Sequence, residues 1–193
     1  MNSIHGAASH AIWFGIFLLF LIGERLLEIK SANRNFRRLL ESGGQEFGAL
    51  HYPAIVAMHT AFFLSLIIEF IVRGFSLAPF WPAPLLIFLL AQTLRLCTRH
   101  AMGDRWTTRI IVVPGERLVT GGPFRFVTHP IYFAVALELV SAPLLFGLYV
   151  TCILFTILNG IMLLAFRIPA ERAALDWSQN PKAPPKEGGG WGW

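Results

Sequence analysis

Three groups of polar side chains interrupt an otherwise apolar chain, and their residue types could bind an anionic or cationic ligand. The first group lies in residues 115–132, which read GERLVTGGPFRFVTHPIY. Its Gly-Gly-Pro segment allows a tight turn, and the pair His129-Pro130 suits the start of a helix. Free N–H groups and the helix dipole make such a start a seat for a carboxylate or another anion. A capped helix with His129 at the membrane interface explains the same spacing without a ligand.

The second group is Arg167 and Glu171, four residues apart and therefore on one face of a helix. A planar guanidinium can hold a carboxylate through two parallel hydrogen bonds. A glutamate one turn further on can hold a cationic or hydroxyl-bearing partner. An ion pair between the two side chains within the helix is the alternative interpretation.

The third group centres on Glu138, which lies about two turns into an apolar segment. A carboxyl group at that depth is costly, so it indicates a functional site or a buried partner such as Arg95. Gln92, Glu69 and His59 raise the same question more weakly. A lone intramembrane histidine is more often a packing residue than a ligand.

The composition indicates what kind of protein must position these groups. Of the 193 residues, 55% are hydrophobic and 14% are charged, whereas soluble domains have about 25% charged residues. We therefore expect one domain in a membrane. The net charge of +5 is not gathered with aromatic residues into one patch, so nucleic-acid binding is not expected. The sequence has no metal-ligand spacing, Walker loop or GxGxxG motif, and its two cysteines are expected to be packed free thiols.

Five apolar segments approach the ~20 residues that a bilayer core requires. The spacing predicts an all-α integral membrane protein with about five transmembrane helices, at 11–29, 53–72, 80–97, 130–147 and 148–168. The last two would form a helical hairpin. Loops are expected at 30–52 and 98–129, followed by a tail from 169.

The basic residues predict the orientation of these helices. With the amino terminus outside, only Arg73 of the sixteen Lys and Arg residues falls on the outer side, as the positive-inside rule requires for an odd number of spans. The carboxyl terminus and a pocket built from the polar groups would then be cytoplasmic. The Pro/Gly-rich segment 176–193 is expected to be mobile.

Taken together, the polar motifs resemble the isoprenylcysteine carboxyl methyltransferase family of integral membrane enzymes. The resemblance covers about residues 103–175, with Trp106 upstream, GERLV at 115–119, GPFR at 122–125, THPIY at 128–132 and RIPAER at 167–172. The amino-terminal half, with ERLLEIKSANRN and HYPAIVAMH, is similar to bacterial members. Three positions depart from the family pattern: Phe124 stands where Tyr is common, Thr128 replaces Arg, and Arg172 replaces a second Glu. These departures leave the acceptor open.

The resemblance implies a single membrane-embedded methyltransferase domain, residues 1–175, whose cofactor-binding part is 103–175. It implies methyl transfer from S-adenosylmethionine to a carboxylate or a phenol or enol oxygen of a lipophilic acceptor, at the cytoplasmic face of a bacterial inner membrane. Arg167 would orient the acceptor. By the same resemblance the cofactor pocket would be lined by Glu116, Arg117, Leu118, Val119, Phe124, His129, Pro130, Ile131, Tyr132 and Glu171, with Trp106, Arg109 and Glu138 as further candidates.

Two other classes of function fit parts of the pattern. Sterol-type reductases share a similar His-Pro-x-Tyr helix entrance and would use NADPH. A membrane scaffold without activity would explain Thr128 and Arg172 as signs of lost catalysis. Five spans and the retained Arg-x-x-x-Glu spacing favour the methyltransferase.

Overall fold

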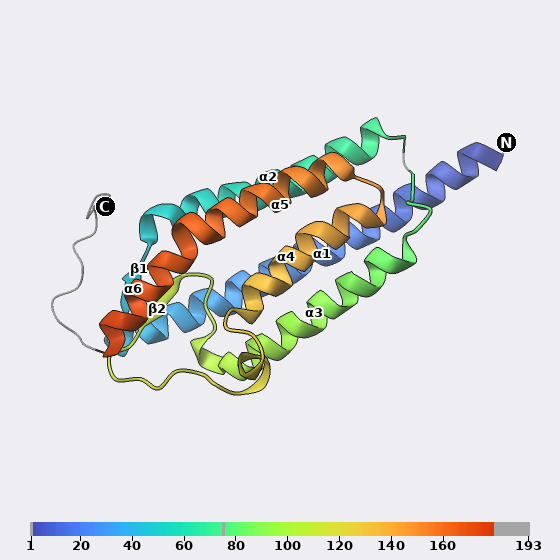
Figure 1. Ribbon diagram of the computed structural model, residues 1–193. Helices are drawn as coiled ribbons and strands as arrows, with labels where there is room; N and C mark the ends of the chain where they lie inside the picture. Colours follow the sequence, from blue (N-terminus) through green and yellow to red (C-terminus); the bar gives the residue numbers. More distant parts are fainter. Residues whose placement is uncertain (1, 75, 180–193) are drawn as a thin grey trace.

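The computed structural model describes residues 2–74 and 76–179, and helices dominate it (Figure 1). The expected all-helical fold is confirmed, with one small addition. Strands β1 (Gln45–Phe47) and β2 (Ile110–Val112) form an antiparallel ribbon in which Gln45 lies opposite Val112. The helices are α1 (Asn2–Glu41), α2 (Tyr52–Val72), α3 (Pro82–Met102), α4 (Pro130–Leu145), α5 (Tyr149–Ile161) and α6 (Ile168–Gln179), with a π-helical segment Met162–Arg167 joining the last two.

The long helices run roughly alongside one another. Figure 1 shows α2 and α5 side by side and α3 beside α4, while α1 extends along the whole bundle. The amino terminus and the α4–α5 turn lie toward one end. Helix α6 and the β-ribbon lie at the other end, together with the irregular chain between α3 and α4. The functional motifs of the sequence therefore gather at this second end, called here the motif end.

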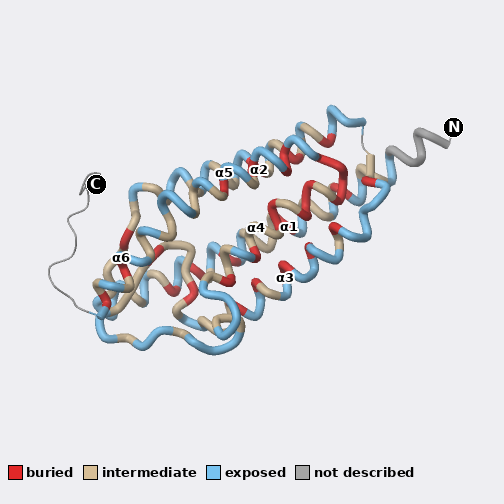
Figure 2. Tube along the Cα trace, viewed as in Figure 1, coloured by how far each residue is buried: buried red, intermediate tan, exposed pale blue. Residues whose placement is uncertain are grey.

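An aromatic cluster holds the helices together toward the opposite end. The rings of Phe14 and Phe70 stack with centroids 3.9 Å apart, and Phe146 meets Phe14 edge-on at 5.0 Å. Leu21 and Leu66 are completely or almost completely buried beside them. Figure 2 shows that exposed residues lie mainly on the outer sides of the helices, and many of these are large and apolar. This arrangement suits a lipid environment, because an apolar outer surface of this extent is unfavourable in water.

Two helical stretches of the described chain, Ala49–Val72 and Tyr149–Gln179, are long and apolar enough to cross a bilayer. Helix α4 is apolar but shorter. Helices α1 and α3 carry charged residues within their length, among them Arg25 and Arg95. The chain is an integral membrane protein, and the count of five spans stays a prediction.

The expected hairpin of the last two apolar segments is confirmed. Gly147 adopts a φ of 66°, a left-handed conformation that glycine takes at little cost. The Leu148 N–H donates to the Pro143 carbonyl at 3.0 Å, which closes the turn. Glu69 accepts hydrogen bonds from the N–H groups of Val150 (3.1 Å) and Thr151 (2.7 Å). This carboxylate therefore caps the start of α5, which explains a polar residue that the sequence left unassigned.

The predicted loop at 30–52 and tail from 169 are both wrong in extent. Helix α1 continues to Glu41 because Ala32 and Asn35 form a buried face against the rest of the protein. Helix α6 reaches Gln179 because Ala174 and Ser178 are buried in the same way. The opposite faces of these helices carry charged side chains, which give the segments an average composition like that of a loop. Residues 180–193, where most of the expected mobile tail falls, lie outside the described residues.

Candidate active site

A cavity of about 650 Å³ opens at the motif end, between the helices and the chain that connects α3 to α4. Its volume lies in the range of about 300–1,000 Å³ that is usual for small-molecule sites. The structure brings almost all of the predicted site residues to its wall: Trp106, Arg109, Glu116, Arg117, Leu118, Val119, Phe124, His129, Pro130, Ile131, Tyr132, Arg167 and Glu171. Glu138 is the exception. Residues more than sixty positions apart thus meet at one concave surface.

The hydroxyl of Tyr132 joins the two polar motifs. It donates to Glu171 Oε2 at 2.5 Å and accepts from Arg167 Nε at 3.2 Å. His129 Nδ1 lies 3.5 Å from the same Glu171 oxygen, and the His129 ring stacks on Tyr132 with centroids 5.2 Å apart. Arg167 and Glu171 form no ion pair with each other in the described structure. The two side chains are instead connected through a tyrosine from the neighbouring helix.

The backbone at the start of α4 leaves one donor beside this group. The N–H groups of Tyr132 and Phe133 both donate to the carbonyl of His129, at 3.1 and 3.2 Å. Pro130 has no N–H, and the N–H of Ile131 has no backbone partner in the part of the chain that the structure describes. The expected helix start therefore presents one amide donor together with the imidazole.

A π-helical segment positions Arg167. The chain from Met162 to Arg167 is wound more widely than an α-helix, a local feature that often occurs at functional sites. Arg167 Nη2 donates to the carbonyl of Thr108 at 2.7 Å, and the Thr108 hydroxyl lies 3.0 Å from the hydroxyl of Tyr52. Arg167 thereby links α4 to the connection between α3 and β2. Sequence reasoning missed Tyr52 and Thr108. Tyr52 could have been found, because it stands next to a helix-starting proline on the side of the predicted loops.

The GERLV turn is fixed to the short 3-10 turn Gly103–Arg105 that follows α3. Arg105 Nε lies 2.8 Å from Glu116 Oε1, and Arg105 Nη1 donates to the carbonyl of Arg117 at 2.5 Å. Because the backbone and the acidic side chain are held in this way, the apolar side chains of Leu118 and Val119 are free to line the cavity. The turn therefore presents both apolar side chains, Leu118 and Val119, and polar ones, Glu116 and Arg117, to the cavity.

Trp106 and Arg109 play different parts in the wall. Trp106 is buried, and its indole N–H has no hydrogen-bond partner among the described residues. This nitrogen is enclosed by protein atoms, and an unsatisfied buried donor is unfavourable. The Arg109 guanidinium lies 2.9 Å from Glu46 Oε1 and 4.5 Å from the centre of the Tyr52 ring. Its contacts are with the protein, and it links the β-ribbon to α2.

Glu138 belongs to a separate cluster deeper in the bundle. It forms ion pairs with Arg25 and Arg95, and both arginines also contact Glu28. Arg95 is the partner expected from the sequence, so that prediction is confirmed. Glu138 itself does not line the cavity, whereas Arg25, Glu28 and Arg95 form part of its inner wall. The cluster joins α1, α3 and α4 and gives the apolar cavity a charged inner end.

Comparison with known proteins identifies the family. A family model described as the isoprenylcysteine carboxyl methyltransferase family matches residues 84–176. The uncharacterized protein YpbQ of Bacillus subtilis is 40% identical over 162 residues, which cover 84% of this chain and 96% of that protein. An uncharacterized protein of Haemophilus influenzae is 24% identical over 169 residues, covering 85% of this chain and 95% of its own length. No solved structure matches the chain. The matched region contains the GERLV, GPFR, THPIY and RIPAER motifs that line the cavity. The chain belongs to the isoprenylcysteine carboxyl methyltransferase family of membrane methyltransferases.

Proposed function

We propose that the protein transfers a methyl group from S-adenosylmethionine to an oxygen atom of a lipophilic acceptor at the cytoplasmic membrane face. One observation carries the proposal. His129 and Tyr132 at the start of α4 meet Arg167 and Glu171, which lie where the π-helical segment continues into α6, on one wall of a cavity. These are the residues that the family resemblance assigns to the cofactor and the acceptor.

The residues of this wall fit the donor. S-adenosylmethionine supplies an activated methyl group on a cationic sulfur atom. Glu171 uses one carboxylate oxygen to contact Tyr132 and His129, and its other oxygen has no hydrogen-bond partner within residues 2–74 and 76–179. A half-satisfied carboxylate favours a cationic or hydroxyl-bearing ligand. Leu118, Val119 and Ile131 add the apolar contacts that ring systems of a ligand require.

Arg167 is held so that it can orient an acceptor. Its Nε and Nη2 atoms bond to Tyr132 and Thr108, while Nη1 has no hydrogen-bond partner in the described chain. A carboxylate acceptor, whose ordinary pKa is near 4, is already ionised and needs no general base. For a phenol or enol, the nearby guanidinium would favour the anion. Positioning therefore supplies most of the catalytic effect, because methyl transfer is a single displacement.

The apolar part of the cavity suits a lipophilic acceptor. Its wall along α2 continues from Tyr52 to Phe63 through Ile55 and Met58, and eleven residues of helix span about 17 Å. We propose that the acceptor's apolar portion lies along this wall with its reactive oxygen toward Arg167. Five spans and an outer amino terminus complete the proposal, as the distribution of Lys and Arg predicts. The inner membrane of a bacterium is the location that the family resemblance implies.

Thermal-shift measurements on the purified protein test the cofactor. S-adenosylhomocysteine should raise the melting temperature and NADPH should not, because a ligand stabilises the fold that it binds. Stabilisation by NADPH alone would instead support a reductase, and no response to either ligand would support a scaffold.

Mass spectrometry then tests the reaction. Incubation of the protein and S-adenosylmethionine with a bacterial lipid extract should yield a lipid that has gained one methyl group, and the Arg167→Ala variant should not produce it. Donor binding without any methylated lipid would limit the proposal to the cofactor. Equal methylation by Arg167→Ala would remove the role assigned to that arginine.

A further inference from the structure

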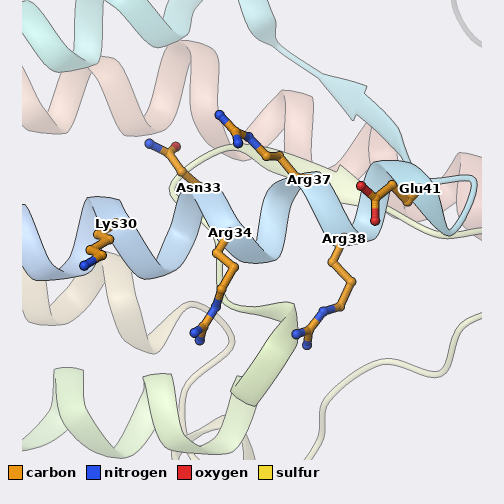
Figure 3. Close-up of a pocket in the computed structure, with 6 residues that line it drawn as sticks. All are labelled: Lys30, Asn33, Arg34, Arg37, Arg38 and Glu41. Carbon is orange, nitrogen blue, oxygen red and sulfur yellow. The ribbon is translucent and has the colours of Figure 1, made fainter.

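A basic face of α1 lies outside the cavity and takes no part in the proposed reaction. It forms a shallow hollow of about 500 Å³ lined by Lys30, Asn33, Arg34, Arg37, Arg38 and Glu41, and Figure 3 shows that all six side chains come from this one helix. All six residues are exposed. Arg38 forms a surface ion pair with Asp104 at 2.5 Å. Lys30, Arg34 and Arg37 have no acidic partner within 4 Å among the described residues.

Helix geometry places this basic face opposite the packed side of α1. Glu28, Ala32 and Asn35 are buried, and they follow one another at intervals of three or four residues, as neighbours on one helix face do. Asn35 donates to the carbonyl of Trp106 at 2.9 Å, so the packed side is fixed against the chain that lines the cavity. The basic face therefore points away from the protein.

The same face changes from apolar to basic within two turns. Leu19 and Leu26 are 71% and 62% exposed, and Asn33 follows Leu26 by seven residues, which is about two helical turns. Lys30 and Arg37 precede and follow Asn33 by three and four residues, so they share this side of the helix. One unpacked helix face thus presents exposed leucines and then, immediately beyond them, unpaired cations.

An apolar surface followed by a basic one is complementary to the acyl chain and the phosphate of one lipid molecule. Acyl chains complement exposed leucines, and a phosphate complements Lys and Arg at the level where the hydrocarbon region ends. A free phosphate or a nucleic acid would use the cations but would gain nothing from the leucines beside them. We propose that this face of α1 binds an anionic phospholipid, with its phosphate between Lys30, Arg34 and Arg37 and an acyl chain along Leu26 and Leu19.

Native mass spectrometry of the full chain in detergent tests the proposal. The protein is mixed with equal amounts of phosphatidylglycerol, which is anionic, and phosphatidylcholine, which is zwitterionic. We expect retained lipid to be mainly phosphatidylglycerol. The double variant Arg34→Gln/Arg37→Gln should lose about fivefold in affinity for phosphatidylglycerol per cation removed, since each basic residue near a lipid surface contributes about 1 kcal/mol.

A matched control removes the same charge elsewhere. Arg125 and Arg172 are exposed residues of the motif end and lie outside the basic face of α1. Arg125→Gln/Arg172→Gln should retain the preference for phosphatidylglycerol. Equal losses in both double variants would show only a general charge effect and would overturn the proposal, as would unchanged retention by Arg34→Gln/Arg37→Gln.

Two further arms identify the ligand's source and separate this site from the cavity. Leu26→Asn should weaken retention of phosphatidylglycerol, and millimolar inorganic phosphate should not displace the lipid. Displacement by phosphate, with no effect of Leu26→Asn, would show a simple anion site and would contradict the proposal. Melting temperatures and S-adenosylhomocysteine affinity should be unchanged in Arg34→Gln/Arg37→Gln, so failure here is distinguishable from failure of the proposed enzymatic function.

Discussion

Glu138 and Glu171 are both carboxylates near arginines, yet their surroundings differ in a way that separates structure from function. The Glu138 side chain is 7% exposed, and each of its oxygens contacts an arginine. The Glu171 side chain is 30% exposed and has one oxygen without a partner in the described residues. A carboxylate whose bonds are all made within the protein holds helices together. One that is half satisfied at a cavity wall is available to a ligand.

Removal of Glu138 should cause the largest loss of stability. Glu138→Ala leaves Arg25 and Arg95 with reduced charge compensation inside the bundle. Loss of one partner from a buried ion pair costs about 3–5 kcal/mol, which corresponds to a drop of about 10 °C in melting temperature for a chain of this size. Thermal unfolding in detergent measures this change.

The matching change at the cavity wall sharpens the comparison. Glu171→Ala should lower the melting temperature by less than about 3 °C, because the side chain is partly exposed and contacts no arginine directly. Equal destabilisation by the two substitutions would show that the carboxylates do not differ as described.

Arg167 should affect turnover more than stability. Arg167→Lys keeps the charge but loses the planar set of donors that reaches both Tyr132 and Thr108. We expect the methyl-transfer rate to fall by about 100-fold, since small errors in position have effects of that size, while the affinity for S-adenosylhomocysteine changes little. Arg172→Lys, at an exposed position of the adjoining helix α6, is the control and should retain full activity. A loss of affinity equal to the loss of rate would place Arg167 in the donor site instead.

Tyr132 should have an intermediate effect, because its hydroxyl connects the two halves of the wall. Tyr132→Phe removes the hydrogen bonds to Glu171 and Arg167. A hydrogen bond to a charged group contributes about 1.5–3 kcal/mol, so the affinity for S-adenosylhomocysteine should fall about tenfold in calorimetry. Tyr149→Phe, at the opposite end of the bundle, should leave it unchanged. Unaltered binding by Tyr132→Phe would mean that the hydroxyl does not position Glu171.

The smallest effect is expected at the partly exposed pair of Arg109 and Glu46. The side chains of Arg109 and Glu46 are 34% and 20% exposed, and Arg109 Nη1 lies 2.9 Å from Glu46 Oε1. Ion pairs accessible to solvent contribute about 0.2–1 kcal/mol, so Glu46→Gln should shift the melting temperature by about 2 °C or less. A fall in melting temperature as large as that of Glu138→Ala would show that burial of a charged group does not determine its contribution to stability here.

Much of the fold follows from hydrophobic pattern and turn chemistry. Apolar runs predicted where α2, α4 and α5 lie. The Phe146-Gly147-Leu148 region predicted the hairpin turn between α4 and α5. The extent of α1 beyond Lys30 was missed, because a helix with one buried face and one basic face has the average composition of a loop. The pattern that reveals it is the recurrence of Glu28, Ala32 and Asn35 along one side.

The sequence predicted which motif residues form the site, but not which of them contact one another. Motif resemblance named the cavity-wall residues that belong to the family motifs, although not Tyr52 or Thr108. The pairing of Glu138 with Arg95 followed from the cost of a buried charge. The spacing of Arg167 and Glu171 left both ligand binding and an ion pair within the helix open. The structure shows no such ion pair among the described residues, because Arg167 donates to Tyr132 and Thr108 instead. The bridging role of Tyr132 depends on how α4 packs against the α5–α6 segment, which no local pattern encodes.

Calorimetric titration of purified protein with S-adenosylhomocysteine tests the central claim most directly. The claim is that His129 and Glu171 together form the donor site. His129→Ala and Glu171→Gln should each weaken binding by at least about tenfold, while Glu41→Gln on the exposed side of α1 should bind like the unaltered protein. Undiminished affinity in both cavity variants, with their melting temperatures preserved, would contradict the account.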